Sequence, residues 1–535
     1  MILGTLSTKI LDKKVKQILN DHSASDSLKS ALSQCVNESP VTKLYSELSS
    51  KYKLESYVKQ NFDYVPPECL MYGGETVGYY LSIKKTLRYV ILDPTFKICK
   101  EQSKGDIIQY MRDGERFKKS TYLKEGRCLT LNMYSDGVSL TNPLGAAKRK
   151  HNILHSYFTL NEFPAWMNSS LSHIFNISFL DTGKTGKKTD FLHRKIVREL
   201  KDLENTGIEV GEHTYKIVVH MYLGDNLEIH EVAGLQTNFN NGYICRLCLI
   251  EHKDLIAHEG NPARRTEEMY NNVMQRLQEY QSSDEEDKDE ENAPIEMREE
   301  HNPHEEESSG EEDNARVTEV AVEEISDGEA EAEDDSIPEA YSNLGWKKRC
   351  EYNKLNNFCS LTAFPFDILH DMLEGVFSYD IPCVIKYYIK KKQFSLNDLN
   401  ARLQQFEYSR YEMKDKPVAF LNEKFTRLPG KGKSSCLLMK ILPYLLQPLV
   451  NINLDQCQMW KCMTKLHRIR EITMAEKFNS ALILELDETI VTYFLIRNEI
   501  PEFCTPKPKH HYITHLPESI SYYGPPTLTW TARYS

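Results

Sequence analysis

The spacing of apolar residues divides the chain into helical and strand-like regions. In residues 1–120 apolar side chains recur three and four positions apart, which predicts a mostly helical N-terminal region. The pattern then changes, because "CLTLNMYSD" (128–136) alternates strictly between apolar and polar positions, as a half-buried strand does. The helical spacing returns from about residue 340 onward, for example in "EKFNSALILELDETIVTYFLIRNEI" (476–500).

Four strand-like runs lie between these helical regions. Runs at 152–160 and 171–180 follow the strand of 128–136, and a helix with one apolar stripe comes next. The stripe consists of Leu192, Ile196, Leu200 and Leu203. The fourth run, "YKIVVHMYLGD" (215–225), is almost continuously apolar, as a central buried strand is.

An acid ends the first and the fourth of these strands, Asp136 and Asp225. Three neighbouring strands, a helix and a buried strand follow one another in the RNase H-like nucleotidyl-transfer fold, where the first and fourth strands lie side by side. Carboxylates at one sheet edge suit Mg²⁺, and a pair of Mg²⁺ ions activates the attacking oxygen and stabilises the leaving oxygen of a phosphodiester. The alternative is that each Asp is a turn or cap residue.

A second candidate site is built from cysteine and histidine. In "GYICRLC" (242–248), Cys245 and Cys248 have the spacing of zinc ligands, and His511 and His515 in "HHYITH" lie on one face of a helical turn. The two pairs together predict a tetrahedral Zn²⁺ site that joins distant parts of the chain. Other residues that could supply the last two ligands are His252, His258, Cys350, Cys359 and His370. A pair of buried thiols without metal is the other alternative.

The net charge of −12 hides an uneven distribution. Residues 281–340 hold 26 Asp or Glu against 3 Lys or Arg, which leaves 63 basic and 52 acidic residues elsewhere, a net charge of +11. A basic body with an acidic segment that contains few apolar groups predicts a nucleic-acid-binding protein with a disordered insert. An ordinary mixed surface is the alternative for the body.

The composition also bears on the compartment. The N-terminus does not follow the order of a signal peptide, and the most apolar stretch, residues 436–450, is interrupted by Lys440, Pro443 and Pro448. This stretch therefore predicts a buried core helix rather than a membrane span. Thirteen cysteines at irregular spacing favour reduced thiols, so we expect a soluble intracellular protein without a membrane partner.

Four blocks of the sequence resemble, in order, those of CACTA (En/Spm-like) DNA transposases of animal genomes. They are "YSDGVSLTNPLG" (134–145), "YLGDNLEIHEVAG" with "CRLCL" behind it (222–249), "FDILHDMLEGV" (366–376) and "PKHHYITHLPESISYYGPPTLTW" (508–530). The likeness runs over roughly residues 85–535. It implies an RNase H-like core interrupted by a helical insertion that zinc pins in place.

The resemblance also assigns roles to residues. It makes Asp136 and Asp225 the first two catalytic acids, with Mg²⁺ as their metal. It makes the zinc ligands Cys245, Cys248, His511 and His515. The family's third acid, a Glu, falls about twenty residues after the histidine pair, which corresponds here to Ser535. We therefore expect an incomplete active site, with Glu374 in "HDMLEGV" as the alternative third acid and a structural helix residue as its plainer interpretation.

The predicted architecture is an α/β RNase H-like core with a large, mostly α-helical, zinc-containing insertion and an α-helical N-terminal region. Its expected boundaries are 1–120, 121–235, 236–520 and 521–535, the last being the start of a truncated C-terminal core helix. The expected function is that of a transposase-derived nuclear protein whose RNase H-like core serves two-metal DNA cleavage and strand transfer. We expect residues 1–535 to be inactive because the third acid is missing, and an active form to be a homo-oligomer on DNA. A non-catalytic DNA- or chromatin-binding protein and a helical scaffold are the alternatives.

Overall fold

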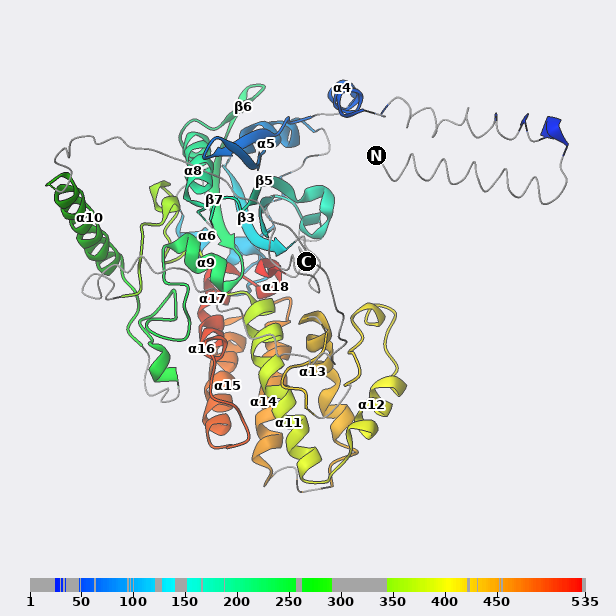
Figure 1. Ribbon diagram of the computed structural model, residues 1–535. Helices are drawn as coiled ribbons and strands as arrows, with labels where there is room; N and C mark the ends of the chain where they lie inside the picture. Colours follow the sequence, from blue (N-terminus) through cyan, green and yellow to red (C-terminus); the bar gives the residue numbers. More distant parts are fainter. Residues whose placement is uncertain are drawn as a thin grey trace, which may run out of the picture.

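The computed structural model describes most of the chain outside the N-terminal and acidic regions (Figure 1). The described residues are 25–28, 30–31, 34, 48, 50–61, 64–93, 96, 98–99, 101–120, 128–139, 152–164, 167–186, 188–255, 262–290, 344–420, 424–430, 432–451, 453 and 456–531. The fold is mixed α/β, with one seven-stranded sheet and a body of helices. Residues 291–340 of the acidic segment and Ser535 lie outside the described residues.

The sheet has the strand order β1-β2-β5-β4-β3-β7-β6. Its strands are β1 (Glu68–Tyr72), β2 (Glu75–Tyr80), β3 (Cys128–Ser139), β4 (Asn152–Leu160), β5 (Phe175–Asp181), β6 (Ile208–Val210) and β7 (His213–Leu223). Every pairing is antiparallel except that of β3 with β7, which is parallel. The four predicted strands are confirmed, with two differences. Leu171–His173 forms a 3₁₀ turn, and β5 begins only at Phe175. Asp136 does not end its strand, because β3 continues to Ser139 and pairs with β4 along this stretch.

The hairpin β1–β2 differs from the expected mostly helical N-terminal region. Its turn is formed by Gly73 and Gly74, whose φ angles are +57° and +83°. Positive φ at both central residues is the condition for a type I′ hairpin turn, and glycine meets it without steric cost. Because β2 pairs with β5, this N-terminal hairpin extends the sheet of the predicted core.

Most of the described helices lie on the sheet or in a separate helical body, whereas α4 (Lys51–Asn61) lies apart from both (Figure 1). The others are α5 (Ile83–Leu92), α6 (Glu115–Lys119), α8 (Asp190–Asn205), α9 (Asn226–Ala233), α10 (Glu267–Glu290), α11 (Phe377–Lys390), α12 (Leu396–Gln405), α13 (Gly432–Leu446), α14 (Gln458–Thr473), α15 (Ser480–Asn498), α16 (Pro508–Tyr512), α17 (Leu516–Tyr523) and α18 (Pro526–Thr529). A π-helix, η6 (Leu369–Val376), leads into α11. Short 3₁₀ turns are η1 (Met111–Asp113), η2 (Met167–Ser169), η3 (Leu171–His173), η4 (His252–Leu255), η5 (Glu351–Lys354), η7 (Met413–Asp415) and η9 (Ile513–His515).

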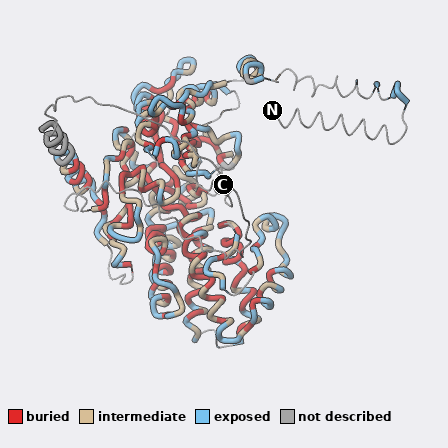
Figure 2. Tube along the Cα trace, in the orientation of Figure 1, coloured by how far each residue is buried: buried red, intermediate tan, exposed pale blue. Residues whose placement is uncertain are grey.

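Two apolar cores hold these layers together. In the first, α8 packs on the sheet through its predicted stripe, and all four residues of that stripe are buried. Burial of each such side chain contributes about 1.5–3 kcal/mol. The second core fills the helical body (α11–α15), including the predicted core helix α13 (Figure 2). In the described part of the chain, no helix combines the length and apolar character that a membrane crossing needs.

Helix α10 runs into the segment expected to be disordered. Its backbone is helical as far as Glu290, so the start of the acidic segment at residue 281 lies within a helix. The first half of α10 packs on the sheet core through Tyr270, Val273 and Leu277. These packed residues precede the acidic run.

Candidate metal centre and acidic sheet edge

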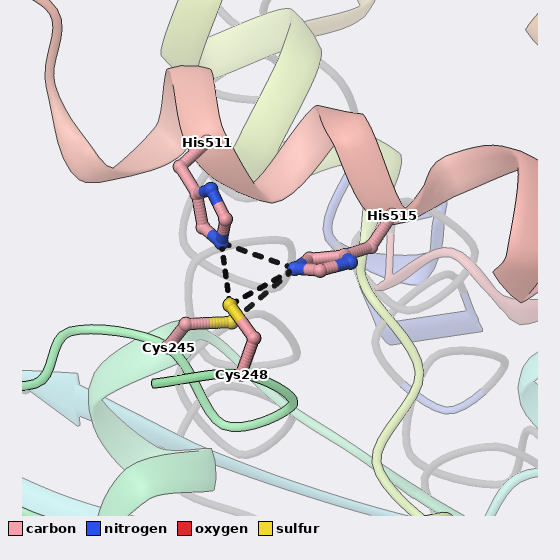
Figure 3. A group of neighbouring side chains, drawn as sticks. All are labelled: Cys245, Cys248, His511 and His515. Carbon is pink, nitrogen blue, oxygen red and sulfur yellow. Dashed lines mark hydrogen bonds between the residues drawn. The ribbon is translucent and has the colours of Figure 1, made fainter. Parts of the chain in front are cut away.

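The four predicted cysteine and histidine ligands lie together and are buried (Figure 3). One ligand atom from each of Cys245, Cys248, His511 and His515 lies within 4.8 Å of all the others. Neighbouring atoms are closer: 3.1 Å from Cys248 Sγ to His511 Nε2, 3.4 Å from Cys245 Sγ to His515 Nε2, and 3.0 Å between the two Nε2 atoms. Tetrahedral Zn²⁺ with its usual bond lengths separates its ligand atoms by about 3.3–3.8 Å. The cluster could therefore bind a metal such as zinc after small adjustments.

Distant parts of the chain supply the two halves of this cluster. The cysteines lie in the loop after α9, where the Leu247 N–H donates to Cys245 Sγ at 3.4 Å. His511 lies in α16, and His515 ends the following turn η9. A direct bond also joins the halves, because the Tyr512 hydroxyl donates to the Ile244 carbonyl at 2.5 Å.

The environment favours one thiolate in the pair. Burial opposes ionisation of Cys245, but the adjacent Cys248 thiol and the two imidazoles outweigh it and hold the pKa of Cys245 well below its ordinary value. A thiolate is the form of cysteine that binds metal. The cluster contains none of the described alternatives, which are His252, Cys350, Cys359 and His370. His258 lies outside the described residues.

The two predicted acids lie at the same edge of the sheet. Strands β3 and β7 run parallel with Tyr134 opposite Leu223, and Asp136 and Asp225 each lie two residues further on. Asp136 is still within β3, opposite His155 of β4, whereas Asp225 follows the end of β7. Both acids are partly buried. Burial raises the pKa of Asp136, and the nearby charge of Asp225 raises it further.

Asp225 is also a helix cap, which is the alternative role expected for an Asp that follows a strand. Its Oδ1 accepts the Glu228 N–H at 2.7 Å at the start of α9. Glu228 is a neighbour that the sequence argument missed: its Oε1 accepts the Ser135 hydroxyl at 2.7 Å. Burial raises the pKa of Glu228 to about 7, and the charges of Asp225 and Asp136 contribute to the shift. The sequence signal was Asp followed three residues later by Glu, a pattern typical of helix N-termini.

The candidate third acid does not join this pair. Glu374 is exposed on η6, and its Oε1 accepts the Gly432 N–H at 3.2 Å, at the start of α13. Among the residues that the structure describes, the cysteine–histidine cluster is the one group of three or more His, Cys, Asp or Glu side chains that could hold a metal ion. Glu374 therefore occupies a helix-contact position.

The residue of the same motif that lies beside the acids is His370. Its Nδ1 is 2.6 Å from Asp367 Oδ2. Burial opposes protonation of His370, but the bond and charge of Asp367, with the charges of Asp225 and Glu374, raise its pKa to about 9. In turn, the charge of His370 partly offsets the rise in the pKa of Asp136.

A chain of side chains connects the metal cluster to the acidic edge. Asp371 Oδ1 accepts from Asn226 Nδ2 at 2.6 Å, and Asn226 Oδ1 accepts from Arg246 Nη1 at 2.7 Å. The guanidinium of Arg246 lies 3.7 Å from the centre of the Phe366 ring, which stacks on His515. These contacts place the cysteine loop, η6 and the start of α9 in one packed unit.

Comparisons with known family descriptions and curated proteins identify no family for the chain. No protein-family description matches the chain, and no curated protein matches it.

Proposed function

We propose that the chain is a transposase-derived protein of the CACTA type that binds DNA and holds Mg²⁺ at Asp136 and Asp225. One observation carries this proposal: the parallel register of β3 and β7 brings these acids together at one sheet edge. Hard Mg²⁺ takes carboxylate oxygens as ligands, and phosphodiester cleavage and joining by two metals needs such an edge.

The strand arrangement supports an RNase H-like core for this proposal. Strands β5, β4 and β3 are antiparallel neighbours, α8 follows them in sequence, and β7 then returns parallel to β3. This is the order expected from the sequence for such a core. The hairpin β1–β2 and the short β6 lie outside it, at the two ends of the sheet.

Zinc in the cysteine–histidine cluster has a structural role in this proposal. Four protein ligands close the coordination shell, so no position remains for a reactive water. The cluster joins the loop after α9 to α16 and η9, and the metal would hold the helical body against the sheet.

The acidic edge provides two of the carboxylates that a two-metal site uses. Because Glu374 binds the Gly432 N–H, the edge would hold one Mg²⁺ loosely, and we expect slow cleavage at most from residues 1–535. Nuclear localisation and assembly into a homo-oligomer on DNA belong to the same proposal.

Nicking of supercoiled DNA tests this function. The zinc-loaded chain is incubated with plasmid and Mn²⁺, beside Asp136→Asn, Asp225→Asn and the exposed control Asp487→Asn. We expect slow nicking that the first two variants lose and the control retains. Nicking that survives both of these substitutions would contradict the proposal, and nicking abolished by Glu374→Ala would make Glu374 the third acid.

The second candidate is a non-catalytic DNA- or chromatin-binding protein that retains the fold and the zinc. This candidate is favoured because Glu374 accepts the Gly432 N–H and forms no three-ligand group with the acid pair among the described residues. DNA binding without nicking, unchanged in Asp136→Asn, would support it. If the chain binds no DNA, a helical structural scaffold is the alternative function that remains.

A further inference from the structure

We propose that His370 donates a hydrogen bond to a phosphodiester oxygen of DNA at the acidic edge. It would thereby supply the third functional group beside Asp136 and Asp225. This inference rests on the proposed function, because it identifies the phosphate contact of the same site.

A buried carboxylate fixes the orientation of the His370 ring. Asp367 accepts the N–H groups of Leu369 and Thr531, each at 3.1 Å, and it also accepts the Thr531 hydroxyl. Its remaining bond, at 2.6 Å, is to His370 Nδ1. Since the bond to Asp367 occupies Nδ1, Nε2 is the ring nitrogen available to a ligand.

The His370 ring is partly exposed to solvent, whereas the Asp367 carboxylate that orients it is buried. The side chain of His370 is 23% exposed, against 4% for that of Asp367. A carboxylate held by several donors inside the protein can orient an imidazole without rearrangement when a ligand arrives. Nε2 can therefore meet a ligand at the surface while Nδ1 remains fixed.

The backbone around His370 is anchored next to Asp225. His370 lies in the π-helix η6, a rare conformation that occurs frequently at functional sites. The next residue, Asp371, accepts a hydrogen bond from Asn226, which directly follows Asp225. Two anchors, Asp367 with Thr531 and Asp371 with Asn226, thus fix His370 relative to the acid pair.

A cationic donor would add to the attraction of a phosphodiester at this edge. The Mg²⁺ proposed at Asp136 and Asp225 would offset their negative charge, and a protonated His370 would supply a directional contact to a phosphate oxygen. The hydrogen bond of 2.6 Å between His370 Nδ1 and the buried Asp367 carboxylate favours the protonated imidazole. A charge-assisted hydrogen bond from an imidazolium to a phosphate oxygen is about twice as strong as a neutral one.

The salt dependence of DNA affinity tests this contact without requiring cleavage. Each neutralised phosphate contributes about 0.9 to the slope of log K against log salt concentration. We compare the full zinc-loaded chain with His370→Gln, His370→Arg and the exposed control His213→Gln, using a short duplex in Ca²⁺. We expect His370→Gln to lower the slope by about 0.9, and the wild-type slope in His370→Arg and His213→Gln.

Each outcome decides the inference. A wild-type slope in His370→Gln overturns it, and equal losses in the Gln and Arg variants indicate a structural role and also overturn it. If His370→Gln fails to fold by circular dichroism, His370→Asn replaces it. Failure of the proposed function gives a different result. Nicking would then persist in Asp136→Asn, whereas His370→Gln would still lower the salt slope of DNA binding. A wild-type chain that does not bind the duplex overturns both.

Discussion

Cys248 is the residue at which the zinc proposal is easiest to test. Its Sγ lies within 3.7 Å of both histidine nitrogens. Loss of one of four ligands weakens a structural zinc site that also stabilises the fold, so Cys248→Ser is expected to lose zinc and at least about 3 kcal/mol of stability. Metal analysis and thermal unfolding measure the two effects. The exposed Cys69→Ser is the matched control and should change neither.

A second residue-scale prediction concerns a buried ion pair inside the helical body. Asp380 is fully buried and accepts from Arg497 Nε at 2.8 Å and Nη2 at 3.0 Å, and its Oδ1 lies 3.2 Å from His510 Nε2. Asp380→Asn leaves the buried Arg497 without its charge partner, which is expected to cost about 3–5 kcal/mol. Denaturant unfolding at neutral pH measures this loss, with the exposed Asp487→Asn as the control.

The pH dependence of this effect follows from the pKa of Asp380. Burial alone would raise that pKa, but His510 and Arg497 outweigh burial and lower it below its ordinary value. A lowered pKa in the folded state stabilises the protein above the unfolded pKa of about 3.9, and this contribution is lost as the pH falls below it. The stability gap between wild type and Asp380→Asn should therefore narrow below about pH 4. A gap that stays constant down to pH 2 would contradict this assignment.

Sequence spacing predicted the residues whose chemistry is unusual and missed those defined by packing. The cysteine and histidine pairs were predicted because each pair is local and its spacing fits one metal. Asp367 was missed because its role depends on Thr531, which is distant in sequence. His370 was considered as a zinc ligand, whereas the structure places it beside the acid pair.

At the scale of elements, α9 connects the acidic edge to the metal loop. It starts at its cap Asp225 and ends at Gly234, whose φ is +74°. A Cβ at Gly234 would also collide with the Lys348 carbonyl oxygen. Gly234→Ala should therefore cost more than the roughly 1–2 kcal/mol of left-handed backbone strain alone.

Gly186 provides the matched control for this prediction. Its φ is +57°, and a Cβ there would meet nothing within 4 Å. Gly186→Ala should thus show the strain without the collision, and denaturant unfolding compares the two variants. Equal losses of stability would contradict the close approach of Lys348 to α9.

Strands and helices with a clear period were predictable, and elements set by turns or by packing were not. Strand β3 alternates and β7 is continuously apolar, so both were found. The hairpin β1–β2 was missed because its two short strands lie next to helical spacing, although the Gly73–Gly74 turn was a usable signal. The π-helical form of η6 has no distinct sequence period.

For the whole molecule, the separation of charge predicts competition for DNA. Residues 281–340 carry a net charge of −23, whereas the rest of the chain carries +11. Deleting 291–340, which leaves α10 intact, should tighten non-specific DNA binding and steepen its salt dependence. A shuffled replacement that keeps the same composition is the control and should bind as the wild type does. Equal affinity of the deletion and the wild type at low and high salt would exclude the competition.

The proposed DNA chemistry requires Asp136 and Asp225 to form one metal site. Electron paramagnetic resonance can follow Mn²⁺ binding to the zinc-loaded chain with duplex DNA. We expect one Mn²⁺ per chain, with affinity reduced at least about tenfold in both Asp136→Asn and Asp225→Asn, since each loses a carboxylate ligand. Asp487→Asn should bind as the wild type does. The same Mn²⁺ affinity in all four proteins would show that Asp136 and Asp225 do not share a metal site.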